Sequence, residues 1–142
     1  MTNRVEWGLF IGRLILGGTM LAHGIQKFTM MDNVVGMFTE NFGLPAFVAY
    51  LTAIVETVAG LALILGLMVE VSALLLGLIM IGAIVTVKFP MAGFFGNGQM
   101  AGYELDLALL ALSIILTVAG SRLFALTNLF SKRDKTTNTA NI

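Results

Sequence analysis

The chain has 142 residues, of which 58% are hydrophobic and only 11% are charged. A water-soluble domain of this length needs a polar shell, so the composition excludes an ordinary soluble protein and indicates a chain whose solvent is mostly lipid. Eight basic and eight acidic residues give a formal net charge of zero, and no basic stripe with interleaved aromatic residues occurs, which argues against a nucleic-acid partner.

Four apolar segments follow one another along the chain, at about residues 5–27, 46–67, 71–89 and 104–120. At a rise of ~1.5 Å per residue, each approaches the ~30 Å thickness of the hydrocarbon layer. The first is interpreted as a span rather than a signal peptide, because Arg13 interrupts it and no small-residue cleavage site ends it. The sequence therefore predicts an all-α membrane protein, a bundle of four transmembrane helices.

Basic residues near the two ends of the chain predict its orientation. They are Arg4, Arg122, Lys132, Arg133 and Lys135. The positive-inside rule places both termini in the cytoplasm, the loops at residues 31–44 and 91–102 outside, and a tight turn near Glu70 inside. Residues 1–130 are predicted to form one transmembrane domain. The tail, residues 131–142, is polar and without apolar periodicity, so it is predicted to be a disordered cytoplasmic segment.

Two ionisable residues lie deep in the predicted spans, Arg13 in the first and Glu56 in the second. A charge near the bilayer centre costs ~3 kcal/mol or more unless it is paired. Each lies about eight to ten residues from the cytoplasmic end of its span, roughly 12 to 15 Å. We expect the two to form a buried ion pair, which either fixes the helix register or serves as a proton or ligand site.

Small and polar residues at helical spacing predict which helix faces pack inward. On the second span the stripe is Ala49, Thr52, Ala53, Glu56, Ala59 and Gly60. On the first span it is Gly8, Gly12, Thr19, His23 and Gln26. Small residues allow close helix packing in membranes, so both faces are predicted to point into the bundle, with His23 near the outer end.

Six polar residues gather at the outer ends of the spans. They are His23, Gln26, Lys27, Lys88, Glu104 and Asp106. Glu104 continues along its helix as Ala108 and Ala111, whereas Asp106 points about 200° away, so only Glu104 is predicted to face the interior. The candidate substrate pocket consists of His23, Gln26, Lys27, Glu56 and Glu104. The alternatives are that the lysines and Asp106 reach out to lipid headgroups, and that His23 only bonds a carbonyl.

The residue inventory also limits cofactors. One histidine, scattered carboxylates and no cysteine give no recognisable ligand spacing for a metal or haem, and no Gly-rich loop follows a strand. No metal and no intrinsic cofactor are predicted, and no catalytic residue can be assigned. An imidazole facing a carboxylate in a dry pocket could exchange protons with a quinone or another reduced substrate.

Several short motifs occur in a characteristic order. They are GRLILG at residues 12–17, AHGIQKF at 22–28, Leu44-Pro45, Glu56 followed by GLALILGL at 60–67, and YEL at 103–105. Over about residues 5–120 this pattern resembles the DoxX family of small four-helix membrane proteins. The chain departs from the family pattern at Lys88, in a region that often carries a histidine. The end of the chain also lacks the Gly-Pro-Gly with Ser-Leu-Asp that many members show.

The resemblance implies a multi-pass protein of a prokaryotic cell membrane that is associated with redox chemistry, since relatives are linked to thiosulfate:quinone oxidoreductase, to membrane oxidoreductase complexes and to quinone and catechol stress. The leading hypothesis is a membrane subunit or accessory of a quinone-linked system whose electrons come from a soluble or membrane partner. One alternative is a small-solute or proton-coupled carrier that uses Arg13 and Glu56 as a switch. Another is a scaffold that recruits a soluble enzyme through residues 122–135. The small-residue faces would also allow a homo-oligomer.

Overall fold

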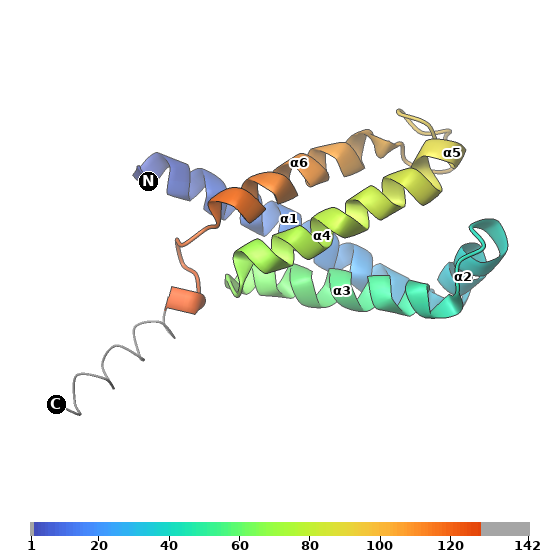
Figure 1. Ribbon diagram of the computed structural model, residues 1–142, viewed down its shortest axis with the longest axis horizontal. Coiled ribbons are helices and arrows are strands. Elements are labelled where there is room, and N and C mark those ends of the chain that lie inside the picture. The colour runs from blue at the N-terminus through green and yellow to red at the C-terminus, as the bar shows by residue number, and fades with distance from the viewer. Residues whose placement is uncertain (1, 129–142) are drawn as a thin grey trace, which may run out of the picture.

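A computed structural model describes residues 2–128, and over this range the regular structure is helical apart from one isolated bridge between Gly96 and Ala101. Four long helices lie along one another: α1 (Asn3–Thr29), α3 (Ala46–Leu65), α4 (Val69–Ala83) and α6 (Tyr103–Ala119) (Figure 1). The shorter elements are α2 (Met31–Gly36), the π-helix η1 (Met37–Asn41), the π-helix η2 (Ile84–Lys88) and α5 (Phe89–Met91). The predicted all-α fold is confirmed.

The long helices match the predicted apolar segments closely. Within residues 2–128, three helical stretches are long and apolar enough to cross a membrane: Asn3–Thr29, Ala46–Leu65 and Val69–Met91, the last combining α4, η2 and α5. Helix α6 is shorter, at 17 residues, and packs along α4. The tail predicted to be disordered, residues 131–142, lies outside the described residues.

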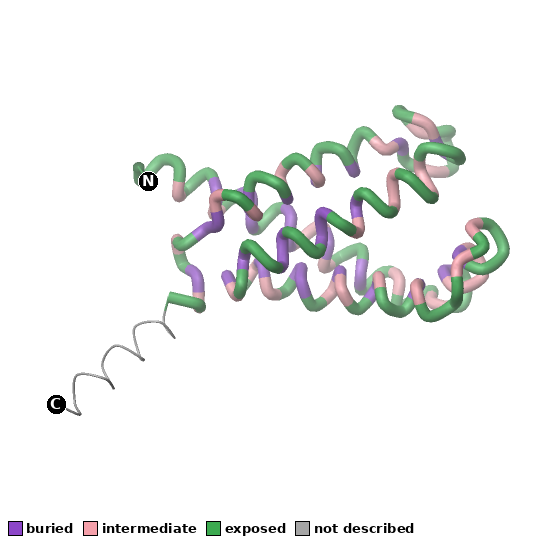
Figure 2. Tube along the Cα trace, viewed as in Figure 1, coloured by how far each residue is buried: buried purple, intermediate pink, exposed green. Residues whose placement is uncertain are grey.

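The outward faces of the long helices carry many large apolar side chains. On α3, for example, Ile54, Val58 and Leu61 are all exposed. Figure 2 shows the buried residues where the long helices face one another and the exposed residues along their outer sides. A helix that is apolar all round suits a lipid surrounding, because hydrocarbon rather than water contacts its outer face.

Helices α1 and α3 run antiparallel and approach each other at glycines. A Cβ atom built on Gly60 would lie 2.7 Å from the backbone nitrogen of Leu21, and one built on Gly17 would lie 2.8 Å from the Gly60 carbonyl oxygen. Any side chain would force the two backbones apart, so glycine is required at these positions. The predicted packing face of the second span is confirmed for Ala49, Ala53, Glu56, Ala59 and Gly60, which are buried, and its remaining member, Thr52, is half-buried.

A second close contact joins α4 to α6. The Ser113 hydroxyl of α6 donates a hydrogen bond to the Ala73 carbonyl of α4, and the absence of a side chain at Gly77 leaves room for that hydroxyl. The α1–α3 pair is connected to the α4–α6 pair through Gly66, the C-cap of α3, whose φ of +70° is in the left-handed region. Glycine adopts this conformation without strain, and the resulting tight turn leads directly into α4.

The first residues of α1 extend past the C-terminal end of α3. Arg13 Nη1 lies 2.8 Å from the position of a Cβ on Gly66, so the preceding residues of α1 extend beyond the end of α3. They pack against the segment that follows α6: the rings of Trp7 and Phe124 are 6.0 Å apart, and the Arg122 backbone nitrogen donates to Glu6 Oε2 at 3.3 Å. The start of α1 and residues 121–128 therefore lie at the same end of the bundle, opposite α2 and α5 (Figure 1).

The α1–α3 contact gives a test of the fold. Gly60→Ala should lower the free energy of unfolding by roughly 1–3 kcal/mol, because the new methyl group would overlap the α1 backbone. Gly18→Ala is the matched control, since a Cβ at Gly18 would meet nothing within 4 Å. Thermal unfolding in detergent measures both variants, and equal stability of the two would contradict the observed helix packing.

Candidate functional site

An ion pair between Lys27 and Glu56 joins α1 to α3 inside the bundle. The Lys27 ammonium donates to Glu56 Oε1 at 2.5 Å. The Glu56 side chain is only 2% exposed, whereas that of Lys27 is 25% exposed. The second carboxylate oxygen, Oε2, is buried and has no hydrogen-bond partner within the described part of the chain. Glu56 thus combines a neutralising lysine with one acceptor that is not used.

The direction of side chains on a helix explains why these two residues meet. Helical side chains lean toward the N-terminus of their own helix. In the antiparallel pair, Lys27 therefore leans from the end of α1 next to α2 toward the middle of α1, and Glu56 leans from the middle of α3 toward that same end. The two charged groups converge at a depth between their Cα atoms.

The predicted ion pair between Arg13 and Glu56 is not formed. Arg13 is fully buried and donates from Nη1 to the Ser121 carbonyl at 3.3 Å and from Nη2 to the Phe124 carbonyl at 3.4 Å. Its guanidinium carbon also lies 5.2 Å from the centre of the Phe10 ring. Because Arg13 leans toward the start of α1, it points away from Glu56 and toward the backbone that follows α6.

The small-residue stripe predicted that His23 and Gln26 face the interior, and this prediction is wrong. Both are exposed, and the residue of this turn that packs against α3 is Gly24, whose missing side chain makes room for Thr57. The buried face of α1 consists of Leu9, Gly12, Arg13, Leu16, Gly17, Met20 and Gly24. Of the predicted stripe only Gly12 is buried, whereas Gly8 is exposed and Thr19 is half-buried. The observed packing face is rotated from the predicted one by about one residue at both ends of α1.

The positions of Glu104 and Asp106 are also the reverse of those predicted. Glu104 is exposed, whereas Asp106 is 8% exposed and lies on the packed face of α6 with Leu109, Ser113 and Leu116. Asp106 Oδ2 lies 3.3 Å from the Lys88 ammonium, so the two form an ion pair, although the contact lacks hydrogen-bond geometry. Lys88 instead donates a hydrogen bond to the Ala101 carbonyl at 3.0 Å. The spacing of Asp106, Leu109, Ser113 and Leu116 was the signal that identifies this face.

The Lys27–Glu56 pair has the chemistry of a small polar binding site. An ammonium group supplies donors, the free carboxylate oxygen supplies an acceptor, and the surroundings are of low dielectric, where both interactions are strong. The same pair can pass a proton to or from a bound hydroxyl or carbonyl group. Among residues 2–128 no three His, Cys, Asp or Glu side chains are placed to hold a metal ion.

Comparison with known proteins places the chain among bacterial membrane proteins. The family model named DoxX matches residues 8–89. A Bacillus subtilis (strain 168) protein named "Putative oxidoreductase CatD" is 37% identical over 138 residues, which cover 97% of this chain and 98% of that protein. A Mycobacterium tuberculosis (strain ATCC 25618 / H37Rv) protein named "Uncharacterized membrane protein Rv3486" is 36% identical over 132 residues, covering 85% of this chain and 80% of that protein. No solved structure matches.

The observed pairing predicts strong energetic coupling between Lys27 and Glu56. Lys27→Met and Glu56→Gln should each lower the free energy of unfolding by roughly 3–5 kcal/mol, with Lys27→Met at the lower end because its ammonium is partly exposed. Each single change leaves an unpaired charge, so the double variant should lose less than the sum of the two, by about 1–3 kcal/mol.

A second cycle provides the control. Arg13→Gln combined with Glu56→Gln should be additive to within about 0.5 kcal/mol, since the two residues share no contact. Unfolding in detergent at increasing denaturant measures both cycles. Coupling in the Arg13 cycle and none in the Lys27 cycle would contradict the pairing described above.

Proposed function

The chain belongs to the DoxX family of membrane proteins, and from that premise we propose that it is a membrane-embedded component of a quinone-linked redox system. The observation that carries the proposal is the buried Lys27–Glu56 pair with its unused oxygen. A relative that aligns over nearly its whole length bears the name of an oxidoreductase, which supports redox chemistry as the general theme.

The charges of the pair suit a quinone and its reduced form. Reduction of a quinone adds two electrons and two protons and converts two carbonyl oxygens into hydroxyl groups. The Lys27 ammonium would donate a hydrogen bond to a quinone oxygen, and Glu56 Oε2 would accept one from a quinol hydroxyl. A proton could then move between the substrate and the carboxylate within hydrogen-bond distance. Quinones dissolve in the hydrocarbon layer and would approach from the side of the partly exposed Lys27, and a small movement of the helices would be needed to uncover Glu56 Oε2.

Electrons would come from a partner protein or directly from a reduced substrate. The sequence has a single histidine and no cysteine, and no Gly-rich dinucleotide motif follows a strand. The proposal therefore assigns this chain the quinone-binding and proton-exchange steps, and assigns electron delivery to a second component.

The two competing functions receive less support from the geometry. A carrier that uses Arg13 and Glu56 as a switch needs the two side chains to act together, but each has different partners. A scaffold would use residues 122–135, half of which, 129–135, lie outside the described residues. Solute flux through vesicles, or release of a partner on deletion of residues 129–142, would favour one of these instead.

We also propose four membrane crossings with both termini in the cytoplasm. Three helical stretches have the required length and apolarity, and α6 runs antiparallel to α4 over 17 residues, which corresponds to roughly 25 Å. The start of α1 and residues 121–128 lie at one end of the bundle, as an even number of crossings requires. Arg4 and Arg122 belong to this end, which favours a cytoplasmic orientation.

Quinone binding can be measured by thermal stability in detergent with ubiquinone and menaquinone analogues. A ligand that binds the folded state stabilises it by about 2.7 kcal/mol at one hundred times its Kd. We expect a saturable rise in stability for the native protein. Glu56→Gln and Lys27→Met should bind about tenfold more weakly, a loss of ~1.4 kcal/mol, because each removes one charged contact.

The exposed residues of the originally predicted pocket serve as controls. His23→Ala and Glu104→Gln should bind the analogues as the native protein does, since neither side chain is buried beside the pair. Each variant is compared with its own ligand-free stability, which separates binding from folding. A native protein that shows no saturable shift would refute the proposed function.

Topology can be tested because the chain has no cysteine, so that each introduced cysteine is unique. Thr2→Cys and Asn138→Cys should react with a membrane-impermeant maleimide only after the cell membrane is opened. Gln99→Cys, in the exposed loop between α5 and α6, should react in intact cells. Labelling of residues 2 and 138 from opposite sides would exclude four crossings.

A further inference from the structure

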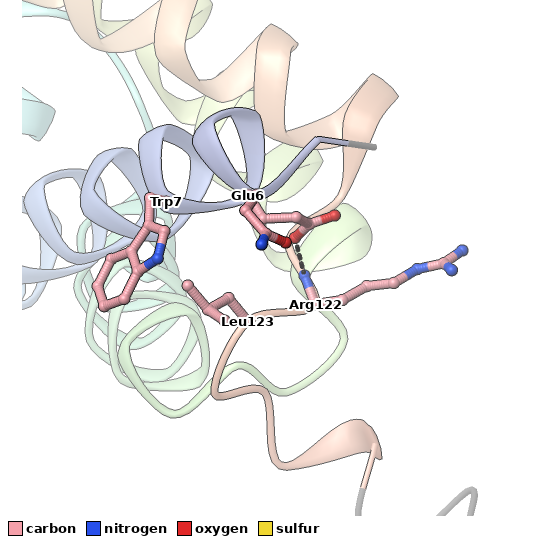
Figure 3. A pocket seen from close by; sticks show the side chains of 5 residues that line it. Glu6, Trp7, Arg122 and Leu123 are labelled. Atoms are coloured by element: carbon pink, nitrogen blue, oxygen red, sulfur yellow. Dashed lines mark hydrogen bonds between the residues drawn. The ribbon is translucent and has the colours of Figure 1, made fainter.

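A small pocket lies at the end of the bundle opposite α2 and α5, where α1 begins. It has a volume of about 220 Å³ and is lined by Asn3, Glu6, Trp7, Arg122 and Leu123. Figure 3 shows that Trp7 and Glu6 come from the first turns of α1, whereas Arg122 and Leu123 come from the segment after α6. The pocket is thus formed between two parts of the chain that are far apart in sequence.

The lining combines both signs of charge with an apolar wall. Glu6 Oε2 accepts the backbone N–H of Arg122 at 3.3 Å, and no described residue donates to its other oxygen, Oε1 (Figure 3). In Figure 3 the exposed Arg122 side chain points outward from the rim of the pocket, away from Glu6 and Trp7, and it donates to no residue among 2–128. It would have to turn toward the pocket to hold a ligand there. Trp7 and Leu123 close the apolar side, and Asn3 adds an amide. Such a lining fits a ligand that carries an anion, a cation and a hydrocarbon portion.

The pocket lies where lipid headgroups are expected. Trp7 precedes Lys27 by 20 positions on one helix, a distance of about 30 Å, which is the thickness of the hydrocarbon layer. Trp7, Phe10 and Phe124 form a cluster with ring centres 5.3 to 6.0 Å apart, and aromatic residues of this kind collect at the membrane boundary.

Behind this aromatic cluster lies a second source of positive charge. Arg13 is fully buried, contacts the Phe10 ring and bonds only carbonyl oxygens among the described residues. Its Nε and the nearby Ser121 hydroxyl are buried without partners. No carboxylate of residues 2–128 forms an ion pair with Arg13, so its charge adds to that of Arg122 and favours an anion at the mouth of the pocket.

We propose that this pocket binds the headgroup of a phospholipid that carries both a phosphate and a primary ammonium group, as in phosphatidylethanolamine. The phosphate would be held by the Arg122 guanidinium and the Asn3 amide, and the ammonium by Glu6 and the face of Trp7. The acyl chains would lie along the apolar outer face of α1. A phosphatidylglycerol headgroup lacks the cation, and a choline headgroup lacks the N–H donors for Glu6.

Trp7 makes the site directly observable, because it is the single tryptophan of the chain. The intact protein is reconstituted in phosphatidylcholine vesicles to which brominated phosphatidylethanolamine, phosphatidylglycerol or phosphatidylcholine is added at equal bromine content. Bromine quenches tryptophan fluorescence only at short range. We expect about a tenfold preference of the site for the ethanolamine lipid, the contribution of one charge-assisted contact.

The variants separate the two halves of the headgroup. Glu6→Gln should make ethanolamine and glycerol lipids equal quenchers, and Arg122→Gln should weaken quenching by both. Glu70→Gln is the control, since Glu70 is an exposed acid of the same end that does not line the pocket. Equal quenching by all three lipids in the native protein would overturn the proposal, as would an ethanolamine preference that survives Glu6→Gln.

This inference depends on the membrane location of the chain and not on its redox role. The pocket and the Lys27–Glu56 pair lie at opposite ends of α1, and they share no residue. Quinone titration of the Glu6 and Arg122 variants should therefore match the native protein. Failure of lipid selectivity and failure of quinone binding are separate results.

Discussion

The close approach of α1 to α3 is the contact on which the rest of the structure depends. In lipid, apolar surface gives no net force between helices, so association relies on packing and on polar contacts. Gly17, Gly24 and Gly60 let the two backbones meet, with so little space that even a methyl group would overlap. This contact sets both the rotation of each helix and the offset of one along the other. It thereby decides which polar groups can reach each other.

That offset explains the distribution of charge in the bundle. Each helix pair carries one lysine near the end that faces α2 and α5 and one buried carboxylate: Lys27 with Glu56 between α1 and α3, and Lys88 with Asp106 between η2 and α6. Arg13 lies instead level with the end of α3 and bonds the backbone that follows α6. Its role there is to hold residues 121–124 against the bundle, since leaving these carbonyls without donors in a dry interior is costly.

The two ends of the bundle differ in chemistry. Toward α2 and α5, the Lys27–Glu56 pair offers an ammonium group and a buried carboxylate oxygen without a partner among the described residues, which suits a molecule that gains and loses protons. At the other end, a pocket of mixed charge beside Trp7 suits a lipid headgroup. Membership of the DoxX family and similarity to a protein named as an oxidoreductase agree with the first assignment, and neither bears on the second.

Length and the order of apolar residues determined the membrane class, the helical fold and the limits of the long helical stretches to within two residues, with α4, η2 and α5 counted as one stretch. The reason is that hydrocarbon thickness dictates how many apolar residues a span needs. The sequence also identified Arg13 and Glu56 as charged residues that need a partner in lipid. It could not determine their partners. Small residues indicated which faces pack, yet His23 and Glu104 lie outside and Asp106 inside. Which charged side chains pair depends on the axial offset and rotation of neighbouring helices. The offset and rotation arise from contacts between two backbones, and the sequence of one helix alone does not specify them.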